Sequence, residues 1–560
     1  MNKIPFLIFI LISLSFIPFE SSTSTLKLNY NSLEDKESWK KAGISLPNYD
    51  VQKLAEKTKK NPVWAHFGIG NIFRIFIGGI ADKLISENYL DKGITCIETF
   101  DYDVVDKIYK PFDNLALAVT LYEDGKQEKK ILGSLTEAIK APAEYERLKE
   151  IIINPNLQLI SFTITEKGYA LHDSEGKYFN FVKSDIENGP GKSTSAMGIV
   201  TSILFERYKA GKFPLSLLSM DNVSQNGKKL RDSVIEMAEK WLEKGFVDKN
   251  FINYIQDEKI IAFPWSMIDK ITPRPSENVA KDLEKLGIEN MNIIITSKIT
   301  YIAPFVNAEF PQYLVIEDNF PNGRPPLEKA PGVYMADRNT VNLSERMKVT
   351  TCLNPIHTAL CTYDCMLGYI LFADGMKDPE LSKLAHQLGY IEGLPVVESP
   401  KIISPEKFLD EVINKRFPNA FLGDTSARIA VDISQMVGIR FGETIKAHIL
   451  QYKNTEKLIA VPLAIAGWIR YLIGKDDKGK DFELSPDPMI PELKEKLNGI
   501  EFGKPETVGE KLKPILSNKN IFGVDLYEAG LGEKIENMVK EELVGVGAVR
   551  ETLKKYLNNI

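Results

Sequence analysis

Short apolar runs alternate with helical patterns through the N-terminal half of the chain. Residues 63–67, 93–100, 115–121, 157–164 and 214–220 form the apolar runs. Apolar residues recur at helical spacing between them, over residues 72–87, 144–153 and 201–209. Because strands that alternate with helices build parallel sheets covered by helices, this pattern predicts a doubly wound α/β domain.

From about residue 330 the pattern changes to longer helical stretches, joined by Gly and Pro. These stretches cover residues 349–372, 378–388, 405–417, 433–452, 456–472 and 538–557. We therefore expect two domains. A sheet domain with a helical arm at its start would cover residues 26–305, and a mostly α-helical C-terminal domain would cover residues 306–560.

Residues 1–25 are unlike the rest of the chain, because an apolar run over residues 4–19 is followed by small polar residues. A short apolar core with such a tail is typical of a secretory signal or a membrane anchor, although it is short for a membrane span. The alternative is an extension from a misplaced start codon, with the protein beginning near Leu26. In either case we exclude this segment from the fold.

The composition is that of a soluble globular protein, with 44% hydrophobic and 26% charged residues among 560. The formal net charge is −6, and Lys and Glu are interspersed without a basic tract. Phosphate binding needs a concentrated cationic surface, so nucleic acid is not expected as a partner.

Four cysteines are too few for a disulfide framework in a chain of this length. Cys361 and Cys365 are four residues apart, and only His357 offers a further ligand nearby. Structural zinc normally has four ligands. We therefore interpret the cysteines as small buried side chains and expect no metal site.

A glycine turn joins the first apolar run to the helical stretch that follows it. Gly68 permits a tight turn, and Gly70 lets backbone amides approach a pyrophosphate at the helix N-terminus. Phe73 stands where the usual fingerprint has a third glycine, and a simple strand–turn–helix produces the same pattern. Together with the alternating strands, the turn favours a Rossmann-type NAD-binding domain.

An acidic residue at the end of the second strand holds the ribose hydroxyls in such domains. Glu98, Asp101 and Asp103 are the candidates. Any of them would favour NAD over NADP, because a carboxylate repels the additional phosphate, and no arginine lies in this window. The alternative is a run of loop carboxylates that face solvent.

Two segments concentrate groups suited to carbonyl–alcohol redox chemistry, Ser219–Asn222 after an apolar strand and Glu345–His357. Oxidation of an alcohol needs a base for the hydroxyl proton and donors for the oxygen. A desolvated lysine such as Lys348 can serve as the base, and asparagine amides can donate. Each residue alone has an ordinary explanation, since most lysines are solvated and most asparagines belong to turns or caps.

From about Val63 to the C-terminus, several motifs in order resemble those of the mannitol dehydrogenase family, the polyol-specific long-chain dehydrogenases. The motifs are His66-Phe-Gly-Ile-Gly-Asn-Ile-Phe-Arg74, Ser161-Phe-Thr-Ile-Thr-Glu-Lys-Gly-Tyr169, Ser219-Met-Asp-Asn222, Phe263-Pro-Trp-Ser-Met-Ile-Asp-Lys-Ile-Thr-Pro273 and Val315-Ile-Glu-Asp-Asn-Phe-Pro-Asn-Gly-Arg-Pro325. The resemblance implies a Rossmann-type domain, a helical C-terminal domain and a metal-free active site between them.

The resemblance also implies a role for individual residues. Lys348 would be the base, and Asn222 and Asn354 would polarise the substrate. His357 would bind the substrate, Asp269 would be the supporting carboxylate, and Glu345 would be the proton relay. The cofactor turn would comprise His66, Gly68, Gly70, Phe73 and Arg74.

This chain departs from the family pattern at three places. Asn354 follows Lys348 by six residues where the family has five, which puts the exact placement of the lysine in question. Trp265 replaces an asparagine and Lys270 an arginine, both beside Asp269. These two changes indicate that the substrate differs from mannitol.

The expected activity is reversible NAD-linked oxidation of a linear, mannitol-like polyol to a ketose. A hexuronate reductase acting on fructuronate or tagaturonate is the alternative, and its carboxylate substrate needs a cation, for which Lys270, Arg274 and Arg324 are candidates. A secreted or membrane-anchored sugar-binding protein without catalysis is a third interpretation, suggested by the apolar N-terminus. The redox chemistry favours a cytoplasmic protein without a firm membrane partner, and no motif specifies an oligomeric state.

Overall fold

The computed structural model describes residues 25–173 and 175–558. The apolar N-terminal segment, up to residue 24, lies outside the described residues, so its interpretation as a signal or an extension stays a prediction. None of the helices in the described ranges combines the length and the apolar character that crossing a membrane requires.

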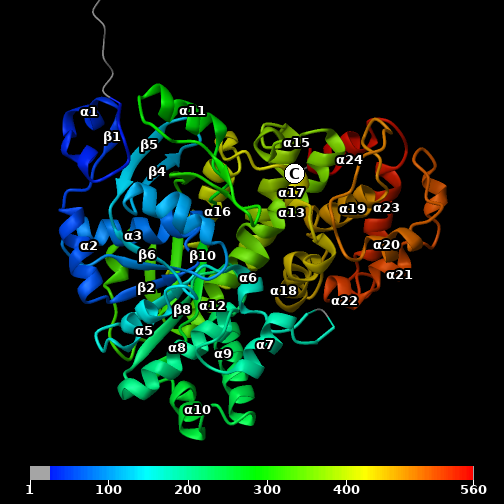
Figure 1. Ribbon diagram of the computed structural model, residues 1–560. Coiled ribbons are helices and arrows are strands. Elements are labelled where there is room, and N and C mark those ends of the chain that lie inside the picture. The colour runs from blue at the N-terminus through cyan, green and yellow to red at the C-terminus, as the bar shows by residue number, and fades with distance from the viewer. Residues whose placement is uncertain (1–24, 174, 559–560) are drawn as a thin grey trace, which may run out of the picture.

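A six-stranded parallel sheet is the centre of the N-terminal lobe (Figure 1). Its strands, in spatial order, are β6 (Leu135–Lys140), β3 (Ile94–Glu98), β2 (Trp64–Phe67), β7 (Leu159–Phe162), β8 (Leu215–Ser219) and β9 (Ile261–Ala262). Numbered along the chain, this is the order 3-2-1-4-5-6 of the dinucleotide-binding fold. All residues of β2 and β3 are buried, as expected for a parallel sheet covered on both faces.

One apolar run belongs to a different sheet from the one we expected. β4 (Ala116–Leu121) pairs antiparallel with β5 (Gln127–Leu132), which follows it after a short turn. The two strands form a local hairpin, and Gly125 adopts φ 86° in the turn. The four-stranded sheet that contains them has the order β1-β5-β4-β13, with β1 at Ile44–Ser45.

The expected domain boundary between residues 305 and 306 falls inside β13 (Phe305–Glu309). This strand pairs with β4 of the N-terminal lobe. β14 (Tyr313–Glu317) then pairs with β10 (Ser266–Asp269), and β15 (Val333–Ala336) pairs with β14. The N-terminal lobe therefore continues to β15, since the strands that complete its smaller sheets come late in the sequence.

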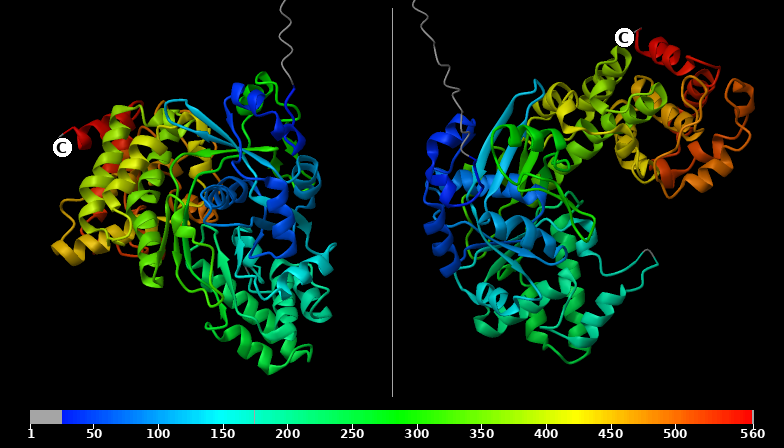
Figure 2. Two further views of the ribbon diagram at one scale, coloured as in Figure 1. Left: turned by 90° about the vertical axis from the view of Figure 1, so that its left-hand side faces the viewer. Right: turned by 45° about the horizontal axis from the view of Figure 1, so that its top comes forward.

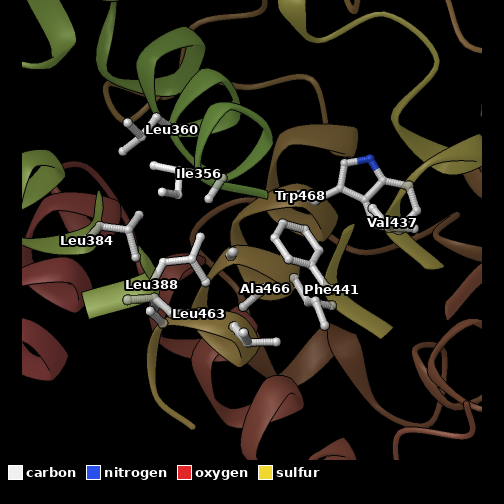
Figure 3. Close-up of a cluster of buried hydrophobic side chains, with 14 of the residues drawn as sticks. Ile356, Leu360, Leu384, Leu388, Val437, Phe441, Leu463, Ala466 and Trp468 are labelled. Carbon is white, nitrogen blue, oxygen red and sulfur yellow. The ribbon is translucent and has the colours of Figure 1, made fainter. Parts of the chain in front are cut away.

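Helices make up the C-terminal lobe, from α12 (Arg338–Met347) to α24 (Ala548–Leu557). Figure 2 shows this lobe beside the sheet lobe. Its core is built around α19 (Ala460–Leu472), in which every residue is buried. Figure 3 shows Leu463 and Trp468 of this helix in the same apolar cluster as Ile356 of α13 (Asn354–Leu367). The expected combination of a doubly wound sheet domain and a mostly helical domain is thereby confirmed.

The helix expected over residues 349–372 is divided. α12 runs into a π-helical turn, η6 (Lys348–Cys352), and Leu353 then leaves the helical conformation with φ −134°. α13 begins at Asn354 and ends at Leu367, and Gly368 directly after it adopts φ 86°. A π turn holds one more residue than an α turn and is common at functional sites. The extra residue between Lys348 and Asn354 is accommodated here.

Candidate active site

Lys348 reaches from the helical lobe into the sheet lobe. Its side chain is buried, and Nζ donates hydrogen bonds to Asn222 Oδ1 at 2.6 Å and to the backbone oxygen of Ile268 at 2.9 Å. Asn222 follows the carboxyl end of β8, and Ile268 lies in β10. The lysine is therefore held at the junction of the two lobes, beside the edge of the sheet where parallel sheets bind ligands.

The surroundings of Lys348 favour its neutral form. Burial lowers the pKa of Lys348 below its ordinary value of 10.5, and Arg416 lowers it further. The carboxylates of Asp269 and Glu345 act in the opposite direction, but the net shift is downward. An amine with a lowered pKa can accept a proton near physiological pH and return it.

Asp269 belongs to a buried ion-pair cluster that joins the lobes. Arg416, at the end of η9 (Val412–Arg416), contacts Asp269 Oδ2 and Glu309 Oε2, each at 2.8 Å. Glu309 also accepts the backbone N–H of Ile271 at 2.6 Å. All three charged side chains are buried. Asp269 therefore supports the lysine from within a fixed cluster, in which Arg416 and Glu309 were not expected from the sequence.

Asn354 and His357 lie one turn apart at the start of α13. Asn354 Oδ1 is buried and has no hydrogen-bond partner among residues 25–173 and 175–558, so it is available to a ligand. The His357 ring stacks on Phe417 at 5.1 Å and meets the edge of Phe372 at 4.6 Å. Burial, with smaller contributions from nearby arginines, lowers the pKa of His357 to about 3. At neutral pH His357 is therefore an uncharged hydrogen-bonding group.

A small cavity of about 10 Å³ lies between His357 and Arg416. Its other walls include Asn419 and Phe417. This volume is close to that of a single water molecule. His357 and Arg416 thus face the same enclosed space, although they are distant in the sequence.

Glu345 lies in the last turn of α12 and is partly exposed. Its Oε2 accepts the backbone N–H of Gln225 at 3.4 Å. The residue is thus placed between solvent and Lys348, whose pKa it raises. This position suits the proton relay that the resemblance implies.

Asp221 organises the loop beside Asn222. Its carboxylate accepts the backbone N–H groups of Ile164 and Thr165 at 3.0 and 2.9 Å, and the hydroxyl of Tyr169 at 2.6 Å. Two of the recognised motifs therefore contact each other through Asp221. The sequence had placed Asp221 in a motif without giving it a role.

The glycine turn fits a dinucleotide. Gly68 adopts φ 84°, and a Cβ there would lie 2.2 Å from the backbone oxygen of Thr163. A Cβ on Gly70 would have no atom within 4 Å, so Gly70 faces open space at the start of the helical segment. The two glycines therefore have different roles. Gly68 allows the chain to pack closely, and Gly70 leaves room for a ligand.

Gly68→Ala should destabilise the protein, whereas Gly70→Ala should fold normally and bind NADH more weakly. The first substitution forces a Cβ against backbone in the left-handed region. The second fills only the space that a pyrophosphate needs. Thermal denaturation and a fluorescence titration with NADH measure the two effects. Equal melting temperatures for both variants would contradict the structural role of Gly68.

The side chains around the turn support it from inside the protein. His66 is buried, and its ring nitrogens bond to Ser161 Oγ at 2.6 Å and Thr163 Oγ1 at 2.9 Å. The ring stacks on Phe73 at 4.0 Å. Arg74 is buried as well and donates to a backbone oxygen at 2.7 Å. His66 and Arg74 thus use most of their polar side-chain atoms inside the protein, and the expectation that His66, Phe73 and Arg74 bind the cofactor stays a prediction.

The three acidic candidates are placed differently. Glu98 ends β3, and its Oε2 accepts the backbone N–H of Ile69 in the glycine turn at 3.3 Å. Asp101 accepts the hydroxyl of Thr296 at 2.7 Å, and Asp103 accepts the backbone N–H of Ser297 at 2.8 Å. Glu98 alone is joined directly to the turn, while Asp101 and Asp103 hold a neighbouring hairpin.

The cations expected for a carboxylate substrate are engaged elsewhere. Lys270 Nζ donates to the backbone oxygen of Glu309 at 2.7 Å, and Arg274 stacks on Tyr301 at 4.2 Å. Arg324 forms ion pairs with two carboxylates near the surface. Arg416 lies beside His357 at the same small cavity, and it is itself paired with Asp269 and Glu309 through Nη1 and Nε.

The four cysteines are free thiols, and all except Cys365 are fully buried. Over residues 25–173 and 175–558, no three His, Cys, Asp or Glu side chains gather as a set of metal ligands.

Two family models match most of the chain. The mannitol dehydrogenase Rossmann domain matches residues 64–329, and the mannitol dehydrogenase C-terminal domain matches residues 341–543. The gap between the matches contains β15, which agrees with a division between the lobes after this strand.

Individual relatives extend over nearly the whole chain. The D-mannonate oxidoreductase of Thermotoga maritima is 52% identical over 95% of this chain and 99% of its own length. Among solved structures, a D-sorbitol dehydrogenase in substrate-free form is 27% identical, with a TM-score of 0.76 over 91% of this chain and 97% of that one. Mannitol 2-dehydrogenase of Pseudomonas fluorescens, in a complex with NAD and D-mannitol, shares the fold at 24% identity, with a TM-score of 0.69 over 96% and 100% of the two chains.

Proposed function

Because the chain belongs to the mannitol dehydrogenase family, we propose that it catalyses reversible NAD-linked oxidation of a secondary alcohol in a linear polyol or sugar acid. Lys348 is the general acid and base. The observation that carries this proposal is the buried Nζ of Lys348, with a lowered pKa, hydrogen-bonded to Asn222 at the junction of the lobes. Chemistry of this kind needs no metal, because Lys348 and the asparagine amides handle the proton and the oxygen.

During oxidation, the neutral Nζ of Lys348 accepts the hydroxyl proton of the substrate. The O–H electron pair then forms the second C–O bond, and the hydrogen on the same carbon leaves with its electron pair. A bound nicotinamide ring supplies the acceptor for that hydride, and in its reduced form the donor. In the reverse direction, the ammonium of Lys348 protonates the forming alkoxide. Glu345 exchanges the proton between Lys348 and solvent.

The two asparagines hold the reacting oxygen. Asn222 Oδ1 is used by Lys348, which leaves its amide hydrogens to donate to the substrate. The Nδ2 group of Asn354 would complete the pair of donors. Its buried Oδ1, which has no hydrogen-bond partner in the described part of the chain, would accept from a substrate hydroxyl. His357, neutral at physiological pH, orients a neighbouring hydroxyl.

The cofactor would lie along the glycine turn. Backbone amides near Gly70 would hold the pyrophosphate, and Glu98 would approach the ribose. NAD is the cofactor that this acidic residue favours, since its carboxylate disfavours a second phosphate nearby.

A sugar acid is favoured over a neutral polyol as the substrate. The D-mannonate oxidoreductase of Thermotoga maritima is 52% identical to this chain, which reverses the preference for a mannitol-like polyol. Arg416 lies beside His357. Its Nε and Nη1 are used by Glu309 and Asp269, but a guanidinium has five N–H donors, so Nη2 is the group that would bind a substrate carboxylate. A hexuronate reductase that interconverts D-mannonate and its keto acid therefore fits best, and a polyol dehydrogenase is second.

An NADH oxidation assay with fructose and fructuronate tests this choice. A charge-assisted hydrogen bond to the substrate carboxylate should raise kcat/KM for fructuronate over fructose by about 10- to 100-fold. Faster reduction of fructose would favour the polyol dehydrogenase instead. A protein that binds sugar without binding NADH would contradict both enzymes.

The pH dependence should report Lys348. In the oxidation direction, kcat/KM should rise with pH as the amine loses its proton, with an apparent pKa below the ordinary 10.5. In the reduction direction it should fall over the same range, because the ammonium is the acid. His357 should add no step near neutrality, since its pKa is about 3. Initial rates in both directions measure this, and a flat profile in either would contradict the assignment.

A further inference from the structure

A β-hairpin from late in the sheet lobe lies against the loop after β3. It consists of β11 (Ile294–Ile295) and β12 (Tyr301–Ile302), with its tip at residues 296–300. Asp101 and Asp103, in the loop after β3, hold this tip through the bonds described above. The hairpin tip is thus fixed beside the place where dinucleotide-binding sheets hold the adenosine ribose.

The tip has a defined and strained backbone. The Thr296 hydroxyl accepts the N–H groups of Lys298 and Thr300 at 3.2 and 3.0 Å, while donating to Asp101. Ile299 adopts φ 62°, which a β-branched residue rarely does, and its side chain is 76% exposed. Such strain persists only where the surrounding bonds impose it. The direction of the tip is therefore set by the fold.

Lys298 extends from this tip over Phe100, with Nζ 5.0 Å from the centre of the ring. Phe100 is 64% exposed and lies two residues after Glu98. Nearby, Lys107 is neutralised by Asp103 at 3.0 Å. Within the described part of the chain, no such ion pair with a carboxylate is formed by Lys298. An exposed cation thus stands over the loop that follows the ribose-binding strand.

The carboxylates of this loop repel an additional phosphate less than the sequence suggests. Asp101 and Asp103 are directed at the hairpin. Glu98 accepts backbone N–H groups from Ile69, Thr99, Phe100 and Asp101. Burial also raises the pKa of Glu98. The electrostatic potential at the ribose site is therefore set by Lys298 as well as by the carboxylates.

We propose that Lys298 and the exposed face of Phe100 form a subsite for the 2′-phosphate of NADP(H), so that the chain accepts this cofactor as well as NAD(H). The subsite rests on the dinucleotide cofactor of the proposed function. It assigns to a residue of the hairpin the role that an arginine after the second strand has in many NADP-binding folds.

Titrating the full chain with NADPH and with NADH, by nicotinamide fluorescence or calorimetry, tests the subsite. Lys298→Ala should weaken NADPH binding by about five- to tenfold, the loss of one exposed charge-assisted contact. NADH binding should change by less than about twofold, as for other surface substitutions. Lys298→Arg should retain NADPH binding. Lys285→Ala removes an exposed lysine of the same lobe and should change neither affinity.

A second probe is independent of turnover. Adenosine 2′,5′-bisphosphate should bind more tightly than AMP, and Lys298→Ala should remove most of this difference. Unchanged affinities of the variant for NADPH and the bisphosphate, or wild-type protein that binds no NADPH, would overturn the subsite and leave an NADH-linked enzyme intact. Normal binding of these ligands without alcohol oxidation would instead contradict the proposed function and leave the subsite standing.

Discussion

Replacing Lys348 with alanine should lower kcat by about 10²- to 10⁴-fold, the range that a general acid–base group supplies. The substitution removes the amine that bonds both Asn222 and the backbone of β10 and that takes the proton in the proposed mechanism. The affinity for NADH should stay nearly unchanged, because the glycine turn lies on other elements. Steady-state rates and an NADH titration of the same preparation measure the two quantities.

Two further variants test whether Lys348 acts by transferring a proton or only by its positive charge. Lys348→Arg keeps the positive charge but cannot release a proton at ordinary pH, so it should be as inactive as alanine. Lys407→Ala removes an exposed lysine of α16 (Pro405–Glu411) and should be as active as the wild type. Near-normal kcat in Lys348→Ala would disprove the assignment, and an active arginine variant would leave only an electrostatic role.

Replacing Arg416 with alanine should lower the free energy of unfolding by about 3–5 kcal/mol, the usual cost of breaking a buried ion pair. The variant leaves Asp269 and Glu309 buried without their shared cation. Activity should fall as well, because Asp269 supports Lys348 and Arg416 faces the cavity at His357. Urea denaturation followed by circular dichroism measures the stability.

The decrease in the free energy of unfolding caused by Arg416→Ala should depend on pH in a defined direction. Burial raises the pKa of Glu309, and Arg416 counteracts this shift. Without Arg416 the carboxyl pKa in the folded state rises further above its unfolded value, so the folded state binds more protons. The deficit in stability should therefore be largest at neutral pH and shrink as the pH falls toward the raised pKa.

Arg428→Ala is the control, since the Arg428 side chain is 67% exposed, although its partner Asp424 is only 13% exposed. Its stability should change by less than about 0.5 kcal/mol. Adding Glu309→Gln to Arg416→Ala should recover part of the loss, because one unpaired charge is removed. If Arg416→Ala were as stable as Arg428→Ala, the cluster would have no structural role.

Local patterns were sufficient for four of the six strands of the parallel sheet, but they did not predict β6 and β9. The buried runs of β2, β3, β7 and β8 carry their signal in consecutive apolar residues, and the glycine turn lies directly after the first of them. The sheet to which β4 belongs was mispredicted, because an apolar run does not specify which strand it pairs with. β4 pairs with β5, which begins six residues after β4 ends. The boundary expected after residue 305 falls inside β13, whose pairing with β4 is likewise not specified by local patterns.

The candidate site was predictable only in part. Lys348, Asn222 and Asn354 stand in recognisable motifs, and the π turn explains how they retain their places despite the extra residue between Lys348 and Asn354. Arg416 lies in an ordinary helical stretch, where an arginine suggests an exposed surface. Lys298 lies far in sequence from the strand end that it faces.

The amino-acid sequence by itself determines the family, the doubly wound sheet and the residue types available for hydride chemistry, because these depend on patterns a few residues long. Only the tertiary structure decides which charges meet. It buries Lys348 against Asn222, pairs Arg416 with two carboxylates from the other lobe and directs Lys298 toward the end of β3. The physical reason is that a pKa and an ion pair depend on burial and distance, and both arise when remote segments pack together.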